Sequence, residues 1–120
     1  MSLSGAHRAA FRKEAERDRQ VFAIRDGDGY PAPADEDGFR TVPFWSRLTR
    51  AQRVVRHVDA YRGFEVVPIA VDEWLTGWLT SLRRDGMLVG LNWAGARATG
   101  YDMTPDQVAE WFEVPLPGDG

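Results

Sequence analysis

The chain contains no cysteine, and this absence removes a set of chemistries at once. Disulfide bonds, thiolate nucleophiles and thiolate metal ligands are all excluded. Histidine is nearly as scarce, because His7 and His57 are the only two and lie 50 residues apart. A zinc or non-haem iron site would have to consist largely of carboxylates. We therefore expect no metal and no cofactor.

Long hydrophobic runs are also missing. The longest, at 21–24 and 87–91, are far shorter than the about 20 apolar residues that cross a bilayer. The first 20 residues are charged throughout and have no apolar segment of the kind that a secretory signal contains. We expect a cytoplasmic protein that makes no contact with a membrane.

Lysine is the third scarce residue, since 14 of the 15 basic residues are arginine. The formal net charge of −3 gives the whole chain no general attraction for nucleic acid, and we expect no nucleic-acid partner. A chain of 120 residues with 43% hydrophobic and 28% charged residues is typical of one globular domain. We expect a single domain over 1–120, with an ordered core at about 5–114 and a loose tail at 115–120.

The segment DGDGYPAPADEDGF at 26–39 raises the question of a calcium loop. An EF-hand loop that began at Asp26 would need an oxygen ligand at its fifth position, glycine at its sixth and glutamate at its twelfth. The chain has Tyr30, Pro31 and Asp37 at these positions. The spacing therefore argues against calcium.

Tight turns explain the same segment better. The pairs Asp28-Gly29 and Asp37-Gly38 are typical of hairpin turns. They predict a three-strand antiparallel meander at about 21–26, 30–35 and 39–45. Two prolines weaken the middle strand and favour an edge position for it.

Arginine and histidine gather on one side of the helix predicted at 46–58. Ser46 is a candidate N-cap, and Thr49 with Gln52 is a candidate capping box. The apolar face consists of Leu48, Ala51, Val54, Val55 and Val58. The opposite face consists of Arg50, Arg53, Arg56 and His57. This second set is either a patch that binds an anion or a partner, or a solvated helix face, and the absence of interleaved aromatic residues favours the solvated face.

The second half of the chain predicts alternating strands and helices. We expect a central strand at 64–70, a helix at 71–86 with Asp72 as N-cap, strands at 87–93 and 98–103 around a turn at 94–97, and a final helix at 104–112. Trp74 and Trp78 continue the aliphatic stripe of the second helix, which favours core packing over an aromatic ligand site.

Local signals refine three of these elements. Gly86 fits the end of the helix at 71–86. Met87, Val89, Leu91 and Trp93 share one alternation phase in their strand, while Gly90 and Gly100 indicate a bulge or a close backbone approach. Thr104, Pro105 and Gln107 form a helix start with a capping box. The predicted fold class is α+β, with an N-terminal helix, the meander, and then helix, strand, helix, strand, strand and helix packed as one two-layer domain.

Three segments together resemble a known family. They are VPFWS before a helix, WLTSLRRDGMLVGLNW after a strand, and GYDMTPDQVAEWF near the end. With a preceding strand that carries Asp-Gly turns, the chain is similar, over about 10–113, to the small bacterial proteins of domain-of-unknown-function family 2750. The resemblance implies a compact bacterial α+β domain of unassigned activity, with no catalytic residues to transfer.

Catalytic motifs are absent from the sequence. We find no nucleophile elbow, phosphate loop or zinc-protease motif, and we assign no catalytic residue. The favoured hypothesis is a non-catalytic protein-interaction or regulatory module with an unknown protein partner, and a homodimer is compatible with it. The alternative is a small-ligand-binding or hydrolytic domain with an aromatic pocket around Trp45, Trp93 and Tyr101 and a carboxylate at Asp102.

Overall fold

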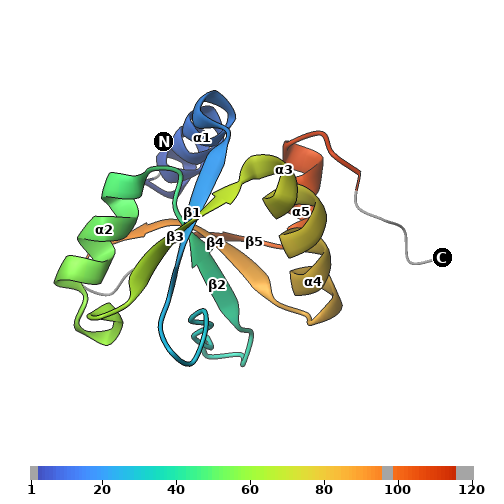
Figure 1. Cartoon of the computed structure of the whole chain (residues 1–120). Coiled ribbons are helices and arrows are strands. Elements are labelled where there is room, and N and C mark those ends of the chain that lie inside the picture. The colour runs from blue at the N-terminus through green and yellow to red at the C-terminus, as the bar shows by residue number, and fades with distance from the viewer. Residues whose placement is uncertain (1–2, 96–98, 116–120) are drawn as a thin grey trace.

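The computed structural model describes residues 3–95 and 99–115 (Figure 1). Most of the tail expected at 115–120 and part of the turn expected at 94–97 lie outside these residues. The elements are α1 Leu3–Asp18, β1 Gln20–Arg25, β2 Thr41–Phe44, α2 Leu48–His57, a 3-10 turn Asp59–Tyr61, β3 Glu65–Ala70, α3 Val71–Glu73, a π-helical turn Trp74–Trp78, α4 Leu79–Arg84, β4 Leu88–Ala94, β5 Thr99–Met103 and α5 Pro105–Trp111. The fold is a compact α+β domain, as expected.

Within the described ranges the strands form two small sheets. One contains β1 and β3, which run antiparallel. The other has the order β2-β4-β5, with β2 parallel to β4 and β5 antiparallel to it. The sheets meet where Phe22 and Trp45 exchange two backbone hydrogen bonds of 2.7 and 2.8 Å. Residues just beyond β2 therefore lie beside the middle of β1.

The predicted three-strand meander is wrong. The segment 30–35 forms no strand, and its one bridge joins Ala34 to Arg40. Pro31 and Pro33 lack the N–H groups that a ladder needs, so this stretch is an extended loop. β1 then pairs with β3, and β2 pairs with β4, which separates the first and third strands of the expected meander into different sheets.

Both turns are present, but each is centred one residue earlier than the Asp-Gly pair that predicted it: the first spans 26–29 and the second 35–38. Asp26 and Gly29 exchange backbone hydrogen bonds, and the Asp28 N–H donates to Asp26 Oδ1 at 2.9 Å. In the second turn Asp35 Oδ1 accepts the N–H groups of Asp37 and Phe39. Two carboxylates of the segment that suggested calcium, those of Asp26 and Asp35, thus accept hydrogen bonds from turn backbone.

The strand β3 is not central. Its one partner among the described strands is β1, and half of its residues are exposed. A central position was expected because apolar residues point to both faces of this strand. Phe64 and Val66 do pack near Trp45 and Val54, but no sheet neighbour covers the outer side of the strand.

The helix expected at 71–86 forms with a π-helical turn in its middle. Ala70 is its N-cap and makes no side-chain cap bond, whereas Asp72 lies in the first turn and pairs with Arg19 at 2.7 Å. The expected N-cap role of Asp72 is therefore wrong, and the expected stop at Gly86 is confirmed by its φ of 69°. The capping box of α5 is also confirmed, because Thr104 and Gln107 bond reciprocally.

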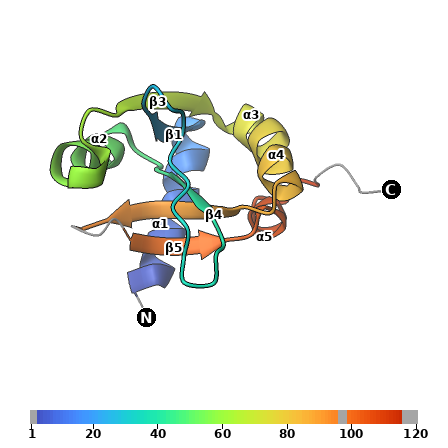
Figure 2. The same ribbon diagram turned by 90° about the horizontal axis from the view of Figure 1, so that it is seen from below.

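Two hydrophobic clusters lie on the two sides of the strands. Trp74 is fully buried in the larger one and packs its ring against Phe11, Phe44 and Phe112 at centroid distances of 5.5, 5.5 and 5.8 Å. The core role predicted for Trp74 is confirmed. The smaller cluster joins α2 to Trp45 and Trp93. Figure 2 shows α2 on one side of the strands and α3, α4 and α5 on the other. No described helix has both the length and the apolar character needed to cross a membrane.

Candidate functional site

The candidate site begins at a bulge in β4. The register of β4 against β5 shifts between Leu91 and Ala94, and Asn92 takes a left-handed conformation with φ 51°. Because the bulge inserts an extra residue, the side chains beyond it point to the opposite faces of the sheet from those that a regular strand would give them. Val89 and Leu91 therefore pack in the larger cluster, whereas Trp93 packs in the smaller one. The single phase expected for these residues is wrong at Trp93.

Two glycines make room for the displaced indole. A Cβ atom at Gly90 would lie 2.6 Å from the Trp93 ring, and one at Gly100 would lie 2.8 Å from Trp93 Cδ1. Of the two alternatives expected for this hairpin, the bulge is confirmed, and a close backbone approach also occurs at Gly100, where a Cβ atom would lie 2.8 Å from the Leu91 carbonyl oxygen. Trp93 Nε1 donates to Asp102 Oδ1 at 2.8 Å, and the Trp93 carbonyl accepts Trp45 Nε1 at 2.8 Å. Asp102 therefore binds the Trp93 indole from β5, and Trp45 binds the Trp93 backbone.

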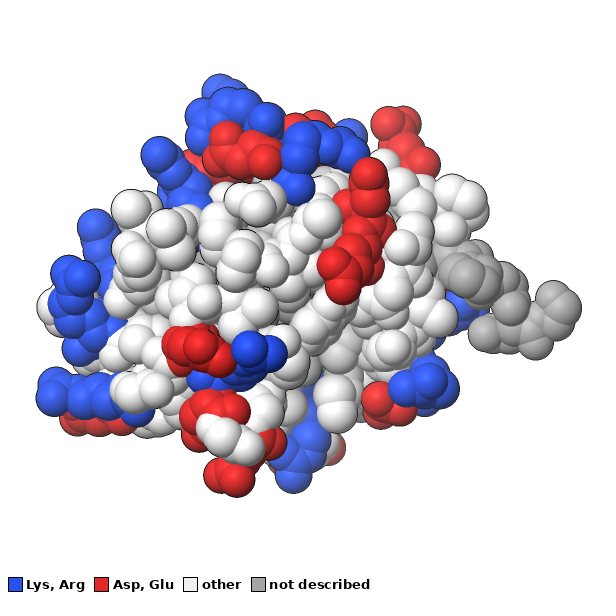
Figure 3. Space-filling model, in the orientation of Figure 1, with Lys and Arg blue, Asp and Glu red and all other residues white. Residues whose placement is uncertain are grey.

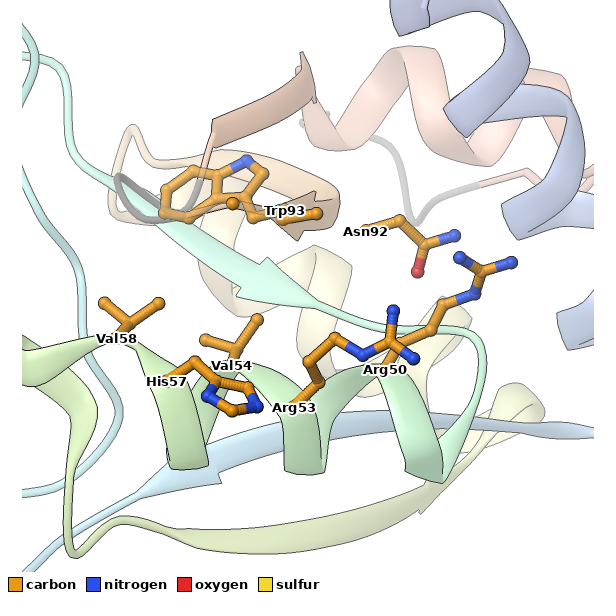
Figure 4. A pocket seen from close by; sticks show the side chains of 9 residues that line it. Arg50, Arg53, Val54, His57, Val58, Asn92 and Trp93 are labelled. Atoms are coloured by element: carbon orange, nitrogen blue, oxygen red, sulfur yellow. The ribbon is translucent and has the colours of Figure 1, made fainter.

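A cavity of about 270 Å³ opens between α2 and this end of β4. It is lined by Arg50, Arg53, Val54, His57, Val58, Asn92, Trp93, Ala94 and Gly95. Figure 4 shows the valines and Trp93 facing each other across the cavity, with the arginine side chains reaching from α2 toward Asn92. Arg50, Arg53 and His57 were expected opposite Val54 and Val58, but all five line the cavity because it lies at the border of the basic and apolar faces, where residues three and four apart are neighbours. The pocket therefore has an apolar interior and a basic rim.

The two rim arginines differ in their partners. Arg50 donates from Nε and Nη2 to the two carboxylate oxygens of Glu14, each at 3.2 Å. Arg53 and His57 make no hydrogen bond or ion pair with any residue in the described part of the chain. Figure 3 shows several basic side chains on the side of the molecule that α2 forms, and a further group over α1. This charge is available to a ligand.

Behind the rim lies a polar network that sequence reasoning missed. The fully buried Ser46 hydroxyl donates to Glu14 Oε1 at 2.7 Å. Asn92 Oδ1 accepts the Ser46 N–H at 3.0 Å, and Asn92 Nδ2 donates to Ser46 Oγ at 3.0 Å. Ser46 is therefore not the N-cap of α2, and neither is Thr49, because α2 begins after Arg47 without a side-chain cap. One feature of the sequence could have indicated this network: Asn92 is a single polar residue inside an otherwise apolar strand.

The network shifts the pKa of Glu14. Burial alone would raise it, but hydrogen bonds from Ser46 and Arg50 and the charges of Arg50 and Arg47 together lower the pKa below the ordinary 4.5. Glu14 is consequently an ionised anchor for Arg50. The burial of the Ser46 hydroxyl gives the pair a structural role, since a substrate could not reach it.

Asp102 has the opposite shift. Its partial burial raises the pKa above the ordinary 3.8, the hydrogen bond from Trp93 opposes the rise, and the negative charge of Asp35 adds to it. Asp102 lies opposite Gly90 in the hairpin, so the carboxylate supports the indole from the β5 side.

The structure combines the two sequence-predicted sites. Arg50, Arg53 and His57 from the basic set and Trp93 from the aromatic set line the same cavity, while Arg56 does not. Trp45 is fully buried beneath Trp93, and Asp102 binds the indole from outside the lining. Tyr101 lies elsewhere, near α1 and α5, with the Arg8 guanidinium 5.4 Å from its ring centroid. The aromatic residue that α2 lacked is supplied by β4.

Together the elements define a class of protein: a small α+β domain with one helix closing a pocket over a bulged hairpin. Comparison with known families makes this specific. The chain belongs to the family described as "Protein of unknown function (DUF2750)", whose model matches residues 8–112. No curated protein and no solved structure matches the chain. The family description assigns no activity, so the pocket has to supply the argument about function.

Proposed function

We propose that this chain is a small-ligand-binding domain and that the cavity between α2 and β4 is its binding site. One observation carries the proposal. The cavity combines an interior of Val54, Val58 and Trp93 with a few convergent polar groups, as small-molecule sites do. The alternative expected from the sequence was a ligand-binding domain with a pocket that included Tyr101. We propose the site beside α2 instead.

The construction of the pocket wall favours this function over core packing alone. Asn92 adopts a left-handed backbone in mid-strand, a conformation that is uncommon outside glycine and that asparagine tolerates better than most residues. The bulge that it creates turns Trp93 toward α2 and leaves a cavity beside it. A structure that served packing alone would do better to fill that space.

A neutral fluorescent probe tests the proposal. N-phenyl-1-naphthylamine is apolar and aromatic, and its emission rises in an apolar site. We expect saturable binding to the wild-type chain. The variant Ala94→Phe, which adds a ring at the lining, should weaken binding about tenfold or more, because the ring occupies the volume of the ligand.

The matched control is Ala60→Phe. Ala60 is exposed, lies in the 3-10 turn after α2 and does not line the cavity. This variant should bind the probe as the wild type does. Equal binding by all three chains, or binding by none, contradicts the proposal. Thermal melting of each variant establishes that the comparison is made between folded proteins.

The second candidate is the interaction module that sequence reasoning favoured. Its supporting observation is the outer side of β3, which has no paired strand among the described residues. An open strand edge can take up a strand from a second copy of the chain. Glu65 and Pro68 disfavour such pairing, so this candidate ranks below the pocket. Light scattering over a range of concentrations would show a dimer that Val67→Lys abolishes, and a wild type that stays monomeric would remove the candidate.

A further inference from the structure

We infer that the ligand of this pocket is an organic anion, with a flat apolar body inside the cavity and a carboxylate, sulfonate or phosphate group held at the rim by Arg53 and Arg50. The inference rests on the proposed function and adds the chemical class of the ligand. It comes from the distribution of charge around the cavity, which the apolar interior alone would not reveal.

The rim has positive charge, and of its described cations only Arg50 pairs with a carboxylate, that of Glu14. No aspartate or glutamate occurs among the described residues that line the cavity, although the chain as a whole has a net charge of −3. Arg53 has no ion pair or hydrogen bond within the described structure. A guanidinium beside an apolar cavity, with no carboxylate to bind, is suited to an anionic group that arrives with the ligand.

Arg50 is positioned to be the second contact. It directs Nε and Nη2 to Glu14, and Nη1 donates to no residue in the described ranges. The lowered pKa of Glu14 keeps that anchor ionised, so the Arg50 side chain is held in place before a ligand binds. Figure 4 shows the guanidinium groups of Arg50 and Arg53 on the same side of the pocket, both near Asn92. Arg53 supplies the uncompensated charge, and Arg50, whose charge Glu14 balances, supplies a further N–H donor for the anion.

The body of the ligand follows from the walls. Val54 and Val58 line the cavity from α2, and Trp93 lines it from β4. The volume of about 270 Å³ is near the lower limit for small-molecule sites. An aromatic acid of one or two fused rings matches this space, whereas a polymer such as nucleic acid does not.

Two dyes that differ in one group separate the anion subsite from the apolar pocket. The first is 8-anilinonaphthalene-1-sulfonate, and the second is N-phenyl-1-naphthylamine, which has the same ring system without the sulfonate. We expect the wild-type chain to bind the sulfonate about tenfold more tightly at low salt, because a charge-assisted hydrogen bond contributes about that factor. The preference should fall as salt is added.

The decisive variant is Arg53→Gln, and its control is Arg56→Gln. Each removes one positive charge from the exposed side of α2, so long-range effects are matched, but only Arg53 lines the cavity. Arg53→Gln should weaken the sulfonate dye about fivefold and leave the neutral dye unchanged. Arg56→Gln should leave both unchanged.

The outcomes distinguish the inference from the proposed function. If both dyes bind with equal affinity and Ala94→Phe expels both, the pocket is real and the anion subsite is wrong. If Arg53→Gln and Arg56→Gln weaken the sulfonate dye equally, the dye responds to general surface charge and the inference is again wrong. If neither dye binds, the proposed function itself fails. A preference for the sulfonate that Arg53→Gln reduces about fivefold and Arg56→Gln leaves unchanged supports both.

Discussion

The Trp93 indole lies so close to Gly90 that a Cβ atom on the glycine would come within 2.6 Å of ring atoms Cε2 and Nε1. Gly90 has no left-handed backbone that would require glycine, so its role is to leave space. The space at Gly90 therefore sets the position of Trp93, which forms the aromatic wall of the pocket.

Gly90→Ala should destabilise the chain by about 2 kcal/mol, because the added methyl group forces the buried indole to move. It should also weaken binding of N-phenyl-1-naphthylamine, since Trp93 lines the cavity. Urea denaturation and dye titration measure the two effects. Gly77→Ala is the control, because no atom lies within 4 Å of the added Cβ atom and alanine favours helix, so its stability should be equal or higher. Equal effects of the two substitutions would contradict the role assigned to Gly90.

Glu14→Gln should destabilise the chain by about 1 to 2 kcal/mol at pH 7, because the charge-assisted bonds from Ser46 and Arg50 become weaker. The pKa of Glu14 is lowered in the folded protein, so its stabilisation is present above the ordinary value of 4.5 and is lost as pH falls through the lower folded value. Urea denaturation from pH 7 to pH 3 should therefore bring the two proteins together in acid.

The control for Glu14 is Glu16→Gln. Glu16 lies on the same helix in an exposed pair with Arg12 at 3.0 Å, a kind of contact that contributes about 0.5 kcal/mol or less. Its substitution should leave the stability nearly unchanged over the same pH range. A loss at Glu16 as large as that at Glu14 would mean that the buried network has no special role.

Local patterns in the sequence predicted the parts of the fold that depend on neighbouring residues. The capping box at Thr104 and Gln107 was predicted because its atoms are three residues apart and satisfy each other. The turn expected at Asp37-Gly38 forms one residue earlier, over 35–38, and it was predicted because its bonds also stay within a few residues. The core role of Trp74 followed from helical periodicity alone.

Strand pairing was mispredicted because it depends on distant residues. The adjacency of β1 and β3 joins residues 50 apart at its outer end, where Gln20 faces Ala70, and no local pattern distinguishes this pairing from the expected meander. The parallel pairing of β2 with β4 requires a crossover through α2, β3 and the helix at 71–84, and no local turn signal predicts such a connection.

The candidate site shows the same division. Gly90 and Gly100 indicated the bulge. The face to which Trp93 points, however, depends on the position of the extra residue, and the sequence does not reveal that this residue is Asn92. The basic face of α2 was visible in the sequence and was assigned to solvent because α2 has no aromatic residue. The aromatic residue comes from β4, about 40 residues further along the chain, so the pocket exists only in the folded structure.

Asn92 offers a test of how the bulge is maintained. Asn92→Gly keeps the left-handed backbone and removes the bonds to Ser46, which should cost about 1 to 3 kcal/mol. Asn92→Ala removes the same bonds and adds backbone strain of about 1 kcal/mol. The alanine variant should thus be the less stable of the two in urea denaturation, whereas alanine is the better residue in ordinary strands. The reverse order would show that the strand relaxes and that the bulge does not depend on this conformation.

Asp102→Asn should be at least as stable as the wild type at pH 7. The pKa of Asp102 is raised in the folded protein, so the folded state binds the proton more tightly than the unfolded state. Ionisation of the carboxyl therefore lowers stability, beginning as pH rises past the ordinary value of 3.8 and reaching its full extent above the higher folded value. Asparagine removes this cost, and its Oδ1 can still accept the hydrogen bond from Trp93 Nε1.

Urea denaturation at several pH values measures the difference, which should be present at pH 7 and disappear as pH approaches 3.8. Asp28→Asn is the control for the change in net charge, because its carboxylate lies in an exposed turn and makes no bond with a described residue. Its effect should stay within about 0.5 kcal/mol. If Asp102→Asn is destabilised at pH 7 and the loss vanishes in acid, the carboxylate stabilises the indole in its charged form, and the direction inferred for its pKa is wrong.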